Sequence, residues 1–316
     1  MRTSRKWHGW QGRFQTAAAA CVAGETATHP EIGSKKGIGM KTLKRSMDII
    51  ADANILRPKI SSAREMRPAS SCQRGIVYNK LNRIGQRMKF YVVSDLHGNL
   101  EGLDPSGVDA VLIAGDFSVM IGWGAAHMAY QLSWVQDVFC KWCVTYPKTM
   151  FFVVPGNHDL FAEREELRAT IKWPSNVKML VDEGCEFNGH GIYGAPWVPF
   201  INGSWAFEEV FPGHLKERFA AIPNNLDILI THSPPMIRHK KIDVSIDANS
   251  PHFGSADLTD AIMRFRPRFV FCGHIHTGDH DPITIDYADG RRTILRNVSR
   301  LDEEYKVRYE PYIFEL

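Results

Sequence analysis

Phe90-Tyr91-Val92-Val93-Ser94-Asp95-Leu96-His97-Gly98 is an apolar run that ends in two potential metal ligands. Its aromatic and β-branched residues predict a buried strand, with Asp95 and His97 at the carboxyl end. The same order recurs four times: Ala110–Ala114 precedes Gly115-Asp116, Met150–Val154 precedes Gly156-Asn157-His158-Asp159, Asp227–Ile230 precedes Thr231-His232, and Phe269–Cys272 precedes Gly273-His274-Ile275-His276.

The remaining periodicity predicts further strands and several helices around this pattern. The additional strands are expected at Gly191–Gly194, Thr293–Arg296 and Tyr312–Glu315. Helices are expected at Ala125–Thr145, Glu163–Ile171, Trp205–Glu209, Gly213–Ala221 and Ser255–Arg266. Strands that alternate with helices indicate a layered α/β domain, and the loops at the carboxyl ends of its strands are expected to meet.

The polar residues after these strands are oxygen and nitrogen donors: aspartates, an asparagine and histidines. Such donors suit Mn, Fe or Zn, whereas a soft thiolate site would need cysteine. Asp95 and His97 are two residues apart, as are His274 and His276, so each pair can contribute two ligands from one loop. Any one of these motifs alone fits a turn or a helix cap better than a functional site, but five in order favour a metal site.

The charge divides the chain into two parts. Residues 1–87 carry 17 Lys and Arg against 5 Asp and Glu, a net charge of +12, and residues 88–316 carry 21 against 30, a net charge of −9. The first part has weak periodicity, so we expect a basic, poorly structured extension, with Met88 as the functional start. A targeting peptide or a nucleic-acid-binding arm are the alternatives for this extension. Residues 88–316 are expected to form one domain.

Composition narrows the class of protein. The 316 residues are 44% hydrophobic and 23% charged, as in an ordinary globular protein, and no apolar run is long enough to span a membrane. The six cysteines are too scattered for a disulfide framework, which favours the cytoplasm. Cys140 and Cys143 have CxxC spacing without a second ligand pair, and the helical periodicity around them predicts packing instead of redox or zinc chemistry.

The five motifs together resemble the calcineurin-like metallophosphoesterase superfamily, whose D-x-H, G-D, G-N-H-D/E, later His and G-H-x-H elements occur here in order. The resemblance covers residues 88–316 and implies an α-β-β-α sandwich of mixed sheets. Within that superfamily the chain is similar to the metallophosphoesterase-domain branch that includes the brain-expressed phosphodiesterases. The segments that carry this finer resemblance are Gly115–Ser118, Ile192–Trp197, Leu229–Pro235 and Arg296–Ser299.

The resemblance implies two divalent ions, Mn²⁺, Fe²⁺ or Zn²⁺, and a bridging hydroxide that attacks phosphorus in line. His158 would assist the leaving group, and Asp159 would orient His158. Asp95, His97 and His276 would hold the first ion, Asn157, His232 and His274 the second, and Asp116 would bridge them.

Several functions remain open from the sequence. A protein phosphatase is disfavoured because Phe117-Ser118 stand where those enzymes carry Asp-Arg-Gly, and Asp159 stands where they carry Glu. A nuclease is disfavoured because the net negative charge of residues 88–316 would repel DNA. Neither nucleic acid nor a membrane is an expected partner. We expect a phosphodiesterase that acts on small or cyclic nucleotide-like substrates, with a phosphomonoesterase, a nuclease or a non-catalytic metal-dependent scaffold as alternatives. Trp197 and Trp205 are expected to pack locally, with a substrate-pocket wall as the alternative.

Overall fold

The apolar runs form two mixed β-sheets in the computed structural model, which describes residues 87–239, 242–245 and 253–316. The first sheet has the order β13-β1-β2-β3-β4, built from Tyr312–Glu315, Lys89–Val93, Ala110–Ala114, Met150–Val154 and Val177–Met179. The second has the order β11-β12-β10-β7-β6-β5, built from Ile283–Asp286, Arg292–Asn297, Phe269–Cys272, Ile228–Thr231, His190–Ala195 and Glu183–Phe187. A short pair, β8 (Arg238–His239) and β9 (Ile242–Asp243), lies apart from both sheets.

The strands that carry the polar motifs are central and parallel within each sheet. β1, β2 and β3 are parallel neighbours, and so are β6, β7, β10 and β12, whereas β13, β11 and β5 add antiparallel edges. In the first sheet, Phe90 pairs with Ala110, and Ala110 pairs with Met150. This register brings the carboxyl ends of β1, β2 and β3 to the same edge of the sheet.

Alternation along each strand divides the core into an inner and an outer part. Phe90 and Val92 belong to the cluster buried between the two sheets, together with Phe152 and Ile230. Tyr91 and the residues in phase with it face the helical layers instead. A strand buried on both faces explains why these segments read as continuous apolar runs instead of alternating ones.

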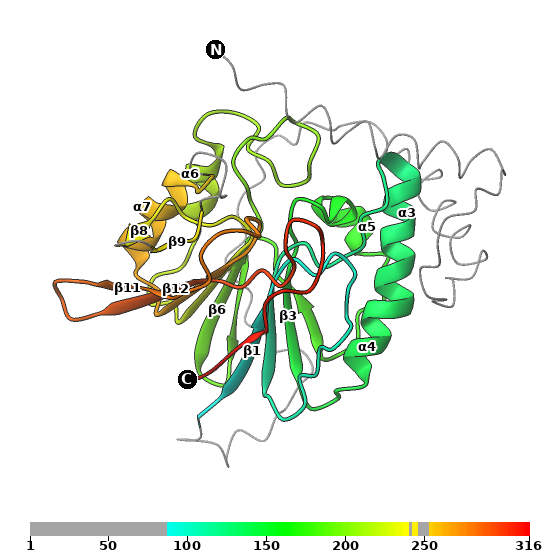
Figure 1. Ribbon diagram of the computed structural model, residues 1–316, viewed down its shortest axis with the longest axis horizontal. Helices are drawn as coiled ribbons and strands as arrows, with labels where there is room; N and C mark the ends of the chain where they lie inside the picture. Colours follow the sequence, from blue (N-terminus) through cyan, green and yellow to red (C-terminus); the bar gives the residue numbers. More distant parts are fainter. Residues whose placement is uncertain (1–86, 240–241, 246–252) are drawn as a thin grey trace.

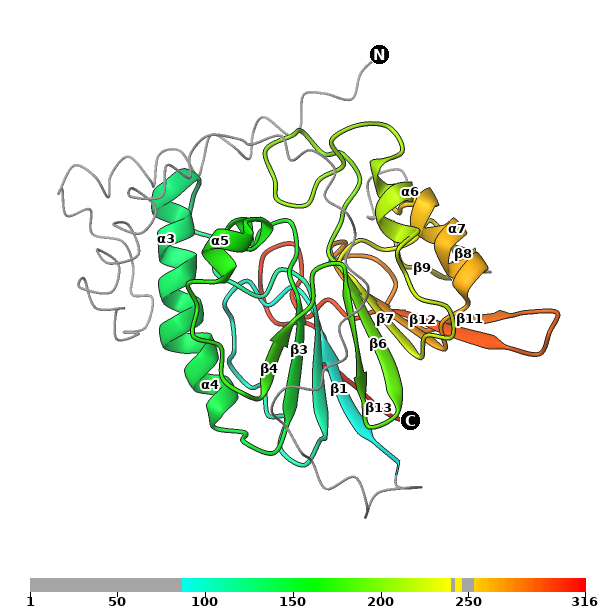
Figure 2. The ribbon, with the colours of Figure 1, turned by 180° about the vertical axis from the view of Figure 1, so that it is seen from behind.

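Helices cover the outer face of each sheet (Figures 1 and 2). The first sheet is flanked by α3 (Gly124–Trp134), a π-helical turn (Val135–Phe139), α4 (Cys140–Val144) and α5 (Glu165–Arg168). The second is flanked by α6 (His214–Phe219) and α7 (Ala256–Phe265), whose first turn is capped by Ser255 accepting the N–H of Leu258 at 3.1 Å. The predicted α-β-β-α sandwich is therefore confirmed.

The helix predicted at Ala125–Thr145 is confirmed, including the packing of its cysteines. Cys140 and Cys143 are both buried against the first sheet. Within the described residues, no helix is long and apolar enough to cross a bilayer. Residues 1–86, where the extension was predicted, lie outside the described residues, so that prediction stays untested.

The helix predicted at Trp205–Glu209 is wrong. Phe207 has φ +55°, in the left-handed region, and the Glu208 carboxylate binds preceding main-chain N–H groups, so the segment forms a turn. The helix predicted at Glu163–Ile171 is shorter in the structure, where α5 covers only the four residues Glu165–Arg168. The strands β4, β5 and β11 were not predicted, since each is a short or partly polar edge strand without a continuous apolar run.

Candidate metal centre

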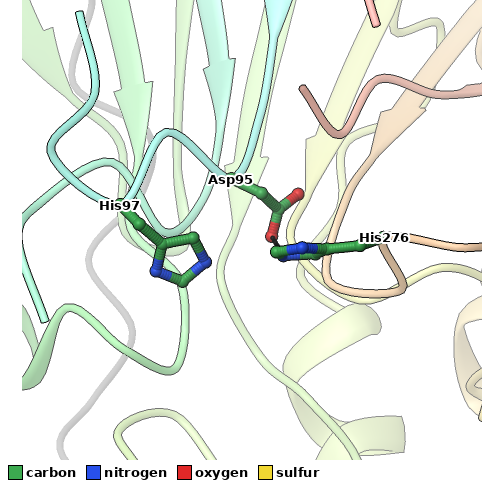
Figure 3. A group of neighbouring side chains, drawn as sticks. All are labelled: Asp95, His97 and His276. Atoms are coloured by element: carbon green, nitrogen blue, oxygen red, sulfur yellow. Dashed lines mark ion pairs between the residues drawn. The ribbon is translucent and has the colours of Figure 1, made fainter. Parts of the chain in front are cut away.

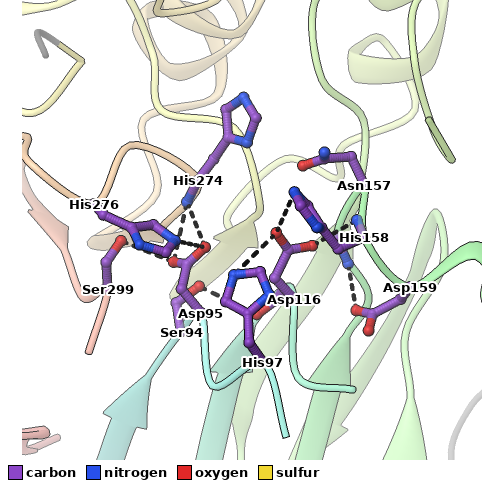
Figure 4. Close-up of polar contacts among 12 residues, drawn as sticks. Ser94, Asp95, His97, Asp116, Asn157, His158, Asp159, His274, His276 and Ser299 are labelled. Atoms are coloured by element: carbon purple, nitrogen blue, oxygen red, sulfur yellow. Dashed lines mark hydrogen bonds and ion pairs between the residues drawn. The ribbon is translucent and has the colours of Figure 1, made fainter. Parts of the chain in front are cut away.

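The five polar motifs meet where the two sheets come together (Figure 4). The main-chain N–H groups of Asp95 and His97 donate to the carbonyls of Gly115 and Asp116 at 3.0 and 2.9 Å, which joins the loops after β1 and β2. Asp95, His97, Asp116 and His274 all have positive φ, between 41° and 70°. Non-glycine residues adopt this conformation at a cost in free energy, and such strain concentrates at functional sites.

The first group of candidate ligands is Asp95, His97 and His276 (Figure 3). One ligand atom from each lies within 4.8 Å of the others, and Nε2 of His276 is 3.3 Å from Oδ1 of Asp95. The other ring nitrogen of His276 lies 3.0 Å from the main-chain oxygen of Asp302. A hydrogen bond there leaves Nε2 for a metal ion, the usual arrangement for a histidine ligand.

The second group of candidate ligands is Asp95, Asp116 and His232, and Asp116 is the member that connects it to the other ligands. Its Oδ2 is 3.3 Å from Nε2 of His232 and 3.7 Å from Nε2 of His97. Nε2 of His232 also lies 2.9 Å from Oδ1 of Asn157, while its Nδ1 donates to the Ala114 carbonyl at 3.0 Å. Asp116 thus reaches the ligands assigned to both ions, as the bridging role requires.

His274 is the predicted ligand that stands somewhat apart. Its main-chain N–H donates to both oxygens of Asp95 at 3.1 Å, but its ring points away from that carboxylate (Figure 4). The ring centroid is 5.0 Å from that of His232, so the two side chains share the same side of the site. The role of His274 as a ligand stays a prediction.

His158 lies at the edge of the ligand group. Its Nε2 is 3.9 Å from Oδ2 of Asp116, and its main-chain N–H donates to Oδ1 of Asp116 at 2.8 Å. The ring packs edge-on against His97 at 4.9 Å between centroids and lies 4.2 Å from the ring of Trp205. His158 also forms a candidate metal-binding group with His97 and Asp116, so the geometry admits it as a ligand as well as a substrate contact.

Asp159 contacts main-chain donors instead of the ring of His158. Its carboxylate accepts hydrogen bonds from the N–H groups of Gly156 at 2.8 Å, Ser118 at 2.9 Å and Phe117 at 3.3 Å, and from the Ser118 hydroxyl at 2.5 Å. These bonds connect the loop after β2 to the loop after β3. The contacts therefore support a positioning role for Asp159, and its predicted action on His158 remains untested.

The side chains present fit a pair of divalent cations. Both ring nitrogens of His97 and Nδ1 of His158 are buried without a hydrogen-bond partner in the described part of the chain. A buried polar atom left unpaired costs about 1–3 kcal/mol, so such atoms usually have a partner. A cation bound to Nε2 of His97, which faces Asp116, would supply a partner to that nitrogen, and nitrogen and oxygen donors are the set that Mn²⁺, Fe²⁺ and Zn²⁺ accept.

The electrostatics divide the histidines into two kinds. Burial opposes a charge on His232 and His276, but the adjacent carboxylates of Asp116 and Asp95 raise the pKa of each ring to about 9. Burial lowers the pKa of His97 to about 3 and that of His274 also to about 3, the latter helped by the positive charge of His232.

The carboxylates respond to the same charges. Burial would raise the pKa of Asp95 and of Asp116, but the surrounding histidines hold both well below the usual range. Burial and the negative charge of Asp116 raise the pKa of Asp159 to about 7. The two carboxylates that face the histidines are therefore ionised and ready to bind cations.

Several residues that sequence reasoning missed complete the site. The Ser299 hydroxyl donates to Asp95 at 2.8 Å, and the ring of Tyr305 packs edge-on against His97 at 4.7 Å between centroids. Gln131 on α3 donates to the main-chain oxygen of His158 at 2.7 Å. Ser299 lies in a segment already noted for its resemblance, whereas nothing in the sequence indicates Tyr305 or Gln131. Asn297, in the same segment, supports the backbone near the site by donating to the Ile275 carbonyl at 2.8 Å.

Trp197 and Trp205 have different surroundings. Trp197 is buried, its Nε1 donates to Asp182, and the Arg218 guanidinium lies 4.2 Å above its ring, so it packs locally as expected. Trp205 instead lies against His158 and also against Trp123, at 4.3 Å between centroids. The aromatic side chain that accompanies Trp205 at the site is thus Trp123.

Comparison with known proteins gives matches over the same part of the chain. Metallophosphoesterase domain-containing protein 1 of Homo sapiens and that of Mus musculus are each 29% identical over 253 residues, covering 72% of this chain and 71% of the relative. The crystal structure of TT1561 of Thermus thermophilus is similar over 71% of this chain and 98% of its own, with 14% identity and a TM-score of 0.43.

The relatives confirm the resemblance to the metallophosphoesterase-domain branch. The family model described as calcineurin-like phosphoesterase matches residues 88–278, the segment that runs from the first strand through all five polar motifs. The chain belongs to the calcineurin-like phosphoesterase family.

Proposed function

We propose that the protein is a metal-dependent phosphodiesterase that hydrolyses small nucleotide-like phosphodiesters, including cyclic ones. The observation that carries this proposal is the buried group of convergent ligands around Asp116, with the unpartnered ring nitrogens of His97 inside it and His158 at its edge. The family supports a phosphoester hydrolase, and the geometry supports the roles of the individual residues.

The residues that would hold the ions are those of the two groups described above. Bound divalent ions would lower the pKa of water and stabilise the charge that develops on the phosphoryl oxygens. Asp116 fixes the spacing of the groups, because its two carboxylate oxygens face His97 and His232 on one side and the His158 main chain on the other. Ser299 and the His274 N–H hold the Asp95 carboxylate in place.

His158 is assigned to the leaving oxygen. Burial lowers its pKa, so the protonated ring is a stronger acid than ordinary imidazolium and the neutral ring still offers an N–H donor. In hydrolysis, the bond between phosphorus and the leaving oxygen breaks, a bond from phosphorus to the oxygen of water forms, and the leaving oxygen takes up a proton. His158 is placed to supply that proton or to stabilise the charge until it arrives.

The charge balance favours a diester over a monoester. The charged groups that act on the pKa of Asp95 are His276, His232 and Asp116, and those that act on the pKa of Asp116 are histidines, with no lysine or arginine among them. Arg300 is buried near the loop after β1, but its guanidinium donates to the main-chain oxygens of Asn99 and Glu101. A monoester dianion carries one more negative charge than a diester, and no lysine or arginine is among the groups that set the pKa values of Asp95 and Asp116 to match it.

The test compares two reporters on the purified protein. Initial rates with Mn²⁺ are measured for bis-p-nitrophenyl phosphate and for p-nitrophenyl phosphate, each with and without a chelator. We expect chelator-sensitive cleavage of the diester, well above that of the monoester. A preference for the monoester would instead indicate a phosphomonoesterase, and bound metal without turnover of either compound, or of cyclic nucleotides, would indicate a scaffold.

A variant tests the assigned role of His158. We expect His158→Asn to retain bound metal and to lose about 10²–10⁴-fold in kcat on adenosine 2′,3′-cyclic phosphate, whose leaving alkoxide needs a proton. The loss should be much smaller on bis-p-nitrophenyl phosphate, whose leaving phenolate does not. The matched control is His190→Asn at the start of β6. Equal losses on both substrates would contradict proton donation by His158.

A further inference from the structure

A line of aromatic rings leads from the candidate ligands to the surface. The ring centroid of His97 is 4.9 Å from that of His158, which is 4.2 Å from that of Trp205, which is 4.3 Å from that of Trp123. Trp123 is 47% exposed, so a large part of its apolar surface is in contact with water. Exposed aromatic area beside a site is typical of a binding surface.

The loop that carries Trp205 is held in place by a buried carboxylate. Glu208, only 3% exposed, accepts hydrogen bonds from the main-chain N–H groups of Ile201 at 2.6 Å, Asn202 at 2.8 Å and Trp205 at 2.9 Å. The neighbouring N–H of Ala206 donates to the main-chain oxygen of Asn157 at 3.1 Å. The position of Trp205 is therefore fixed relative to the loop that carries the ligands.

Gln131 on α3 binds Val119, four residues before Trp123 in the chain. The Gln131 side chain is fully buried, and its Nε2 donates to the main-chain oxygens of Val119 at 3.1 Å and His158 at 2.7 Å. Its Oε1 accepts the N–H of Phe161 at 3.2 Å. One side chain thus connects the segment that leads to Trp123 with the segment that carries His158.

The tryptophan pair lies on the side of the site where His158 acts. In Figure 4, His158 and His276 lie on opposite sides of His97, and Trp205 packs against the His158 ring with an angle of 36° between the planes. Trp205 is thus the ring that packs against His158 on this side, and Trp123 packs against Trp205 beyond it.

We propose that Trp123 and Trp205 form a subsite for an aromatic or heteroaromatic ring on the leaving alcohol of the phosphodiester, as a nucleoside provides. This inference rests on the proposed function, since it assigns the leaving-group side from His158. Stacking on an aromatic side chain tolerates any base, because every base has a π-face, and it changes binding by about 5- to 150-fold per ring. The subsite therefore selects nucleoside diesters as a class and not one particular base.

The experiment uses two substrates with the same scissile bond. Adenosine 2′,3′-cyclic phosphate carries a base, and 1-O-methylribose 2′,3′-cyclic phosphate does not. We expect the ratio of their kcat/KM values to favour adenosine in the wild type and to fall about tenfold or more in Trp123→Leu and in Trp205→Leu. The control is Trp173→Leu, a partly buried tryptophan that packs against the main core, in which the ratio should stay at the wild-type value.

Binding gives a second measurement that needs no turnover. Isothermal titration calorimetry of the metal-loaded protein compares adenosine 5′-monophosphate with ribose 5-phosphate. We expect the nucleotide to bind at least tenfold more tightly, with that advantage lost in Trp123→Leu. Equal affinities in the wild type, or an advantage unchanged in both tryptophan variants, would overturn the subsite. If the binding advantage is absent but the wild type still cleaves diesters, the subsite is overturned and the proposed function stands. If the binding advantage is present but no diester is cleaved, the proposed function is overturned and the aromatic-ring site stands.

Discussion

Metal binding should release protons from two specific rings. In the metal-free protein the pKa of His232 and that of His276 are both about 9, so at pH 8 about 90% of each ring is protonated. A metal ion binds only the neutral ring, so loading both ions at pH 8 should release nearly two protons from these rings, roughly 1.8, in addition to the proton lost by a metal-bound water that becomes hydroxide. His97 and His274, with pKa values of about 3, are already neutral and release none.

The sign of the pH dependence follows from the raised pKa. Protons and metal ions compete for the same nitrogen. The apparent affinity of each ion should therefore increase about tenfold for each unit by which the pH is raised toward 9, and it should become constant above pH 9. In the metal-free protein these protonated rings stabilise the fold below pH 6.5, and that stabilisation should be lost as the pH rises through 9. Metal loading and the stability of the metal-free protein thus change in opposite directions with pH.

The assay is calorimetric titration of metal-free protein with Mn²⁺ at pH 8 in two buffers of different ionisation enthalpy. The difference in heat gives the number of protons released. At this pH Asp159, with a pKa of about 7, is already mostly ionised and adds little to the count. His276→Asn should release about one proton fewer, and His190→Asn should match the wild type. Release of fewer than one proton by the wild type, or an unchanged count in His276→Asn, would refute the reasoning.

Three further predictions follow from the packing of the site. In Gly156→Ala the new Cβ would overlap Oδ1 of Asp116, so we expect a loss of at least about tenfold in Mn²⁺ affinity in a chelator competition assay, with an unchanged circular dichroism spectrum. Asp159→Asn places an amide N–H against the main-chain N–H groups that the carboxylate now accepts from. Urea denaturation with excess chelator should therefore give a free energy of unfolding about 2–4 kcal/mol lower than that of the wild type. Burial raises the pKa of Cys140 to about 12 and also raises that of Cys143. A pulse of iodoacetamide at pH 8 should therefore alkylate the peptide that contains both cysteines less than a tenth as much in native protein as in urea. Equal alkylation would show that the helix is open.

The ligand motifs could be found from sequence because each one directly follows a continuous apolar strand. Asp95 and Asp116 come after strands buried on both faces, and the parallel register brings the ends of those strands together. The order of elements therefore contains most of the information about which side chains meet at the candidate site. The position of a histidine ring within that site, as for His274, depends on side-chain angles that the pattern does not specify.

The parts that could not be predicted depend on contacts between distant segments. Glu208 replaces the expected helix by binding N–H groups up to seven residues away, and this contact positions Trp205. Trp123 meets Trp205 across 82 residues of chain, so no local pattern indicates the pair. Asp159 illustrates a different difficulty, because a motif names the residue but the donors around it, on the loop after β2, become visible only in the fold.

The central claim, that the buried ligands form a two-metal phosphodiesterase site, is tested most directly by titrating metal-free protein with Mn²⁺ while following the hydrolysis of bis-p-nitrophenyl phosphate. We predict that the rate rises with added metal until two equivalents per chain are bound, and that Asp116→Asn, which removes the charge shared by both groups, abolishes this rise. Full turnover in the presence of chelator, or a rate that reaches its plateau at one equivalent, would contradict the claim.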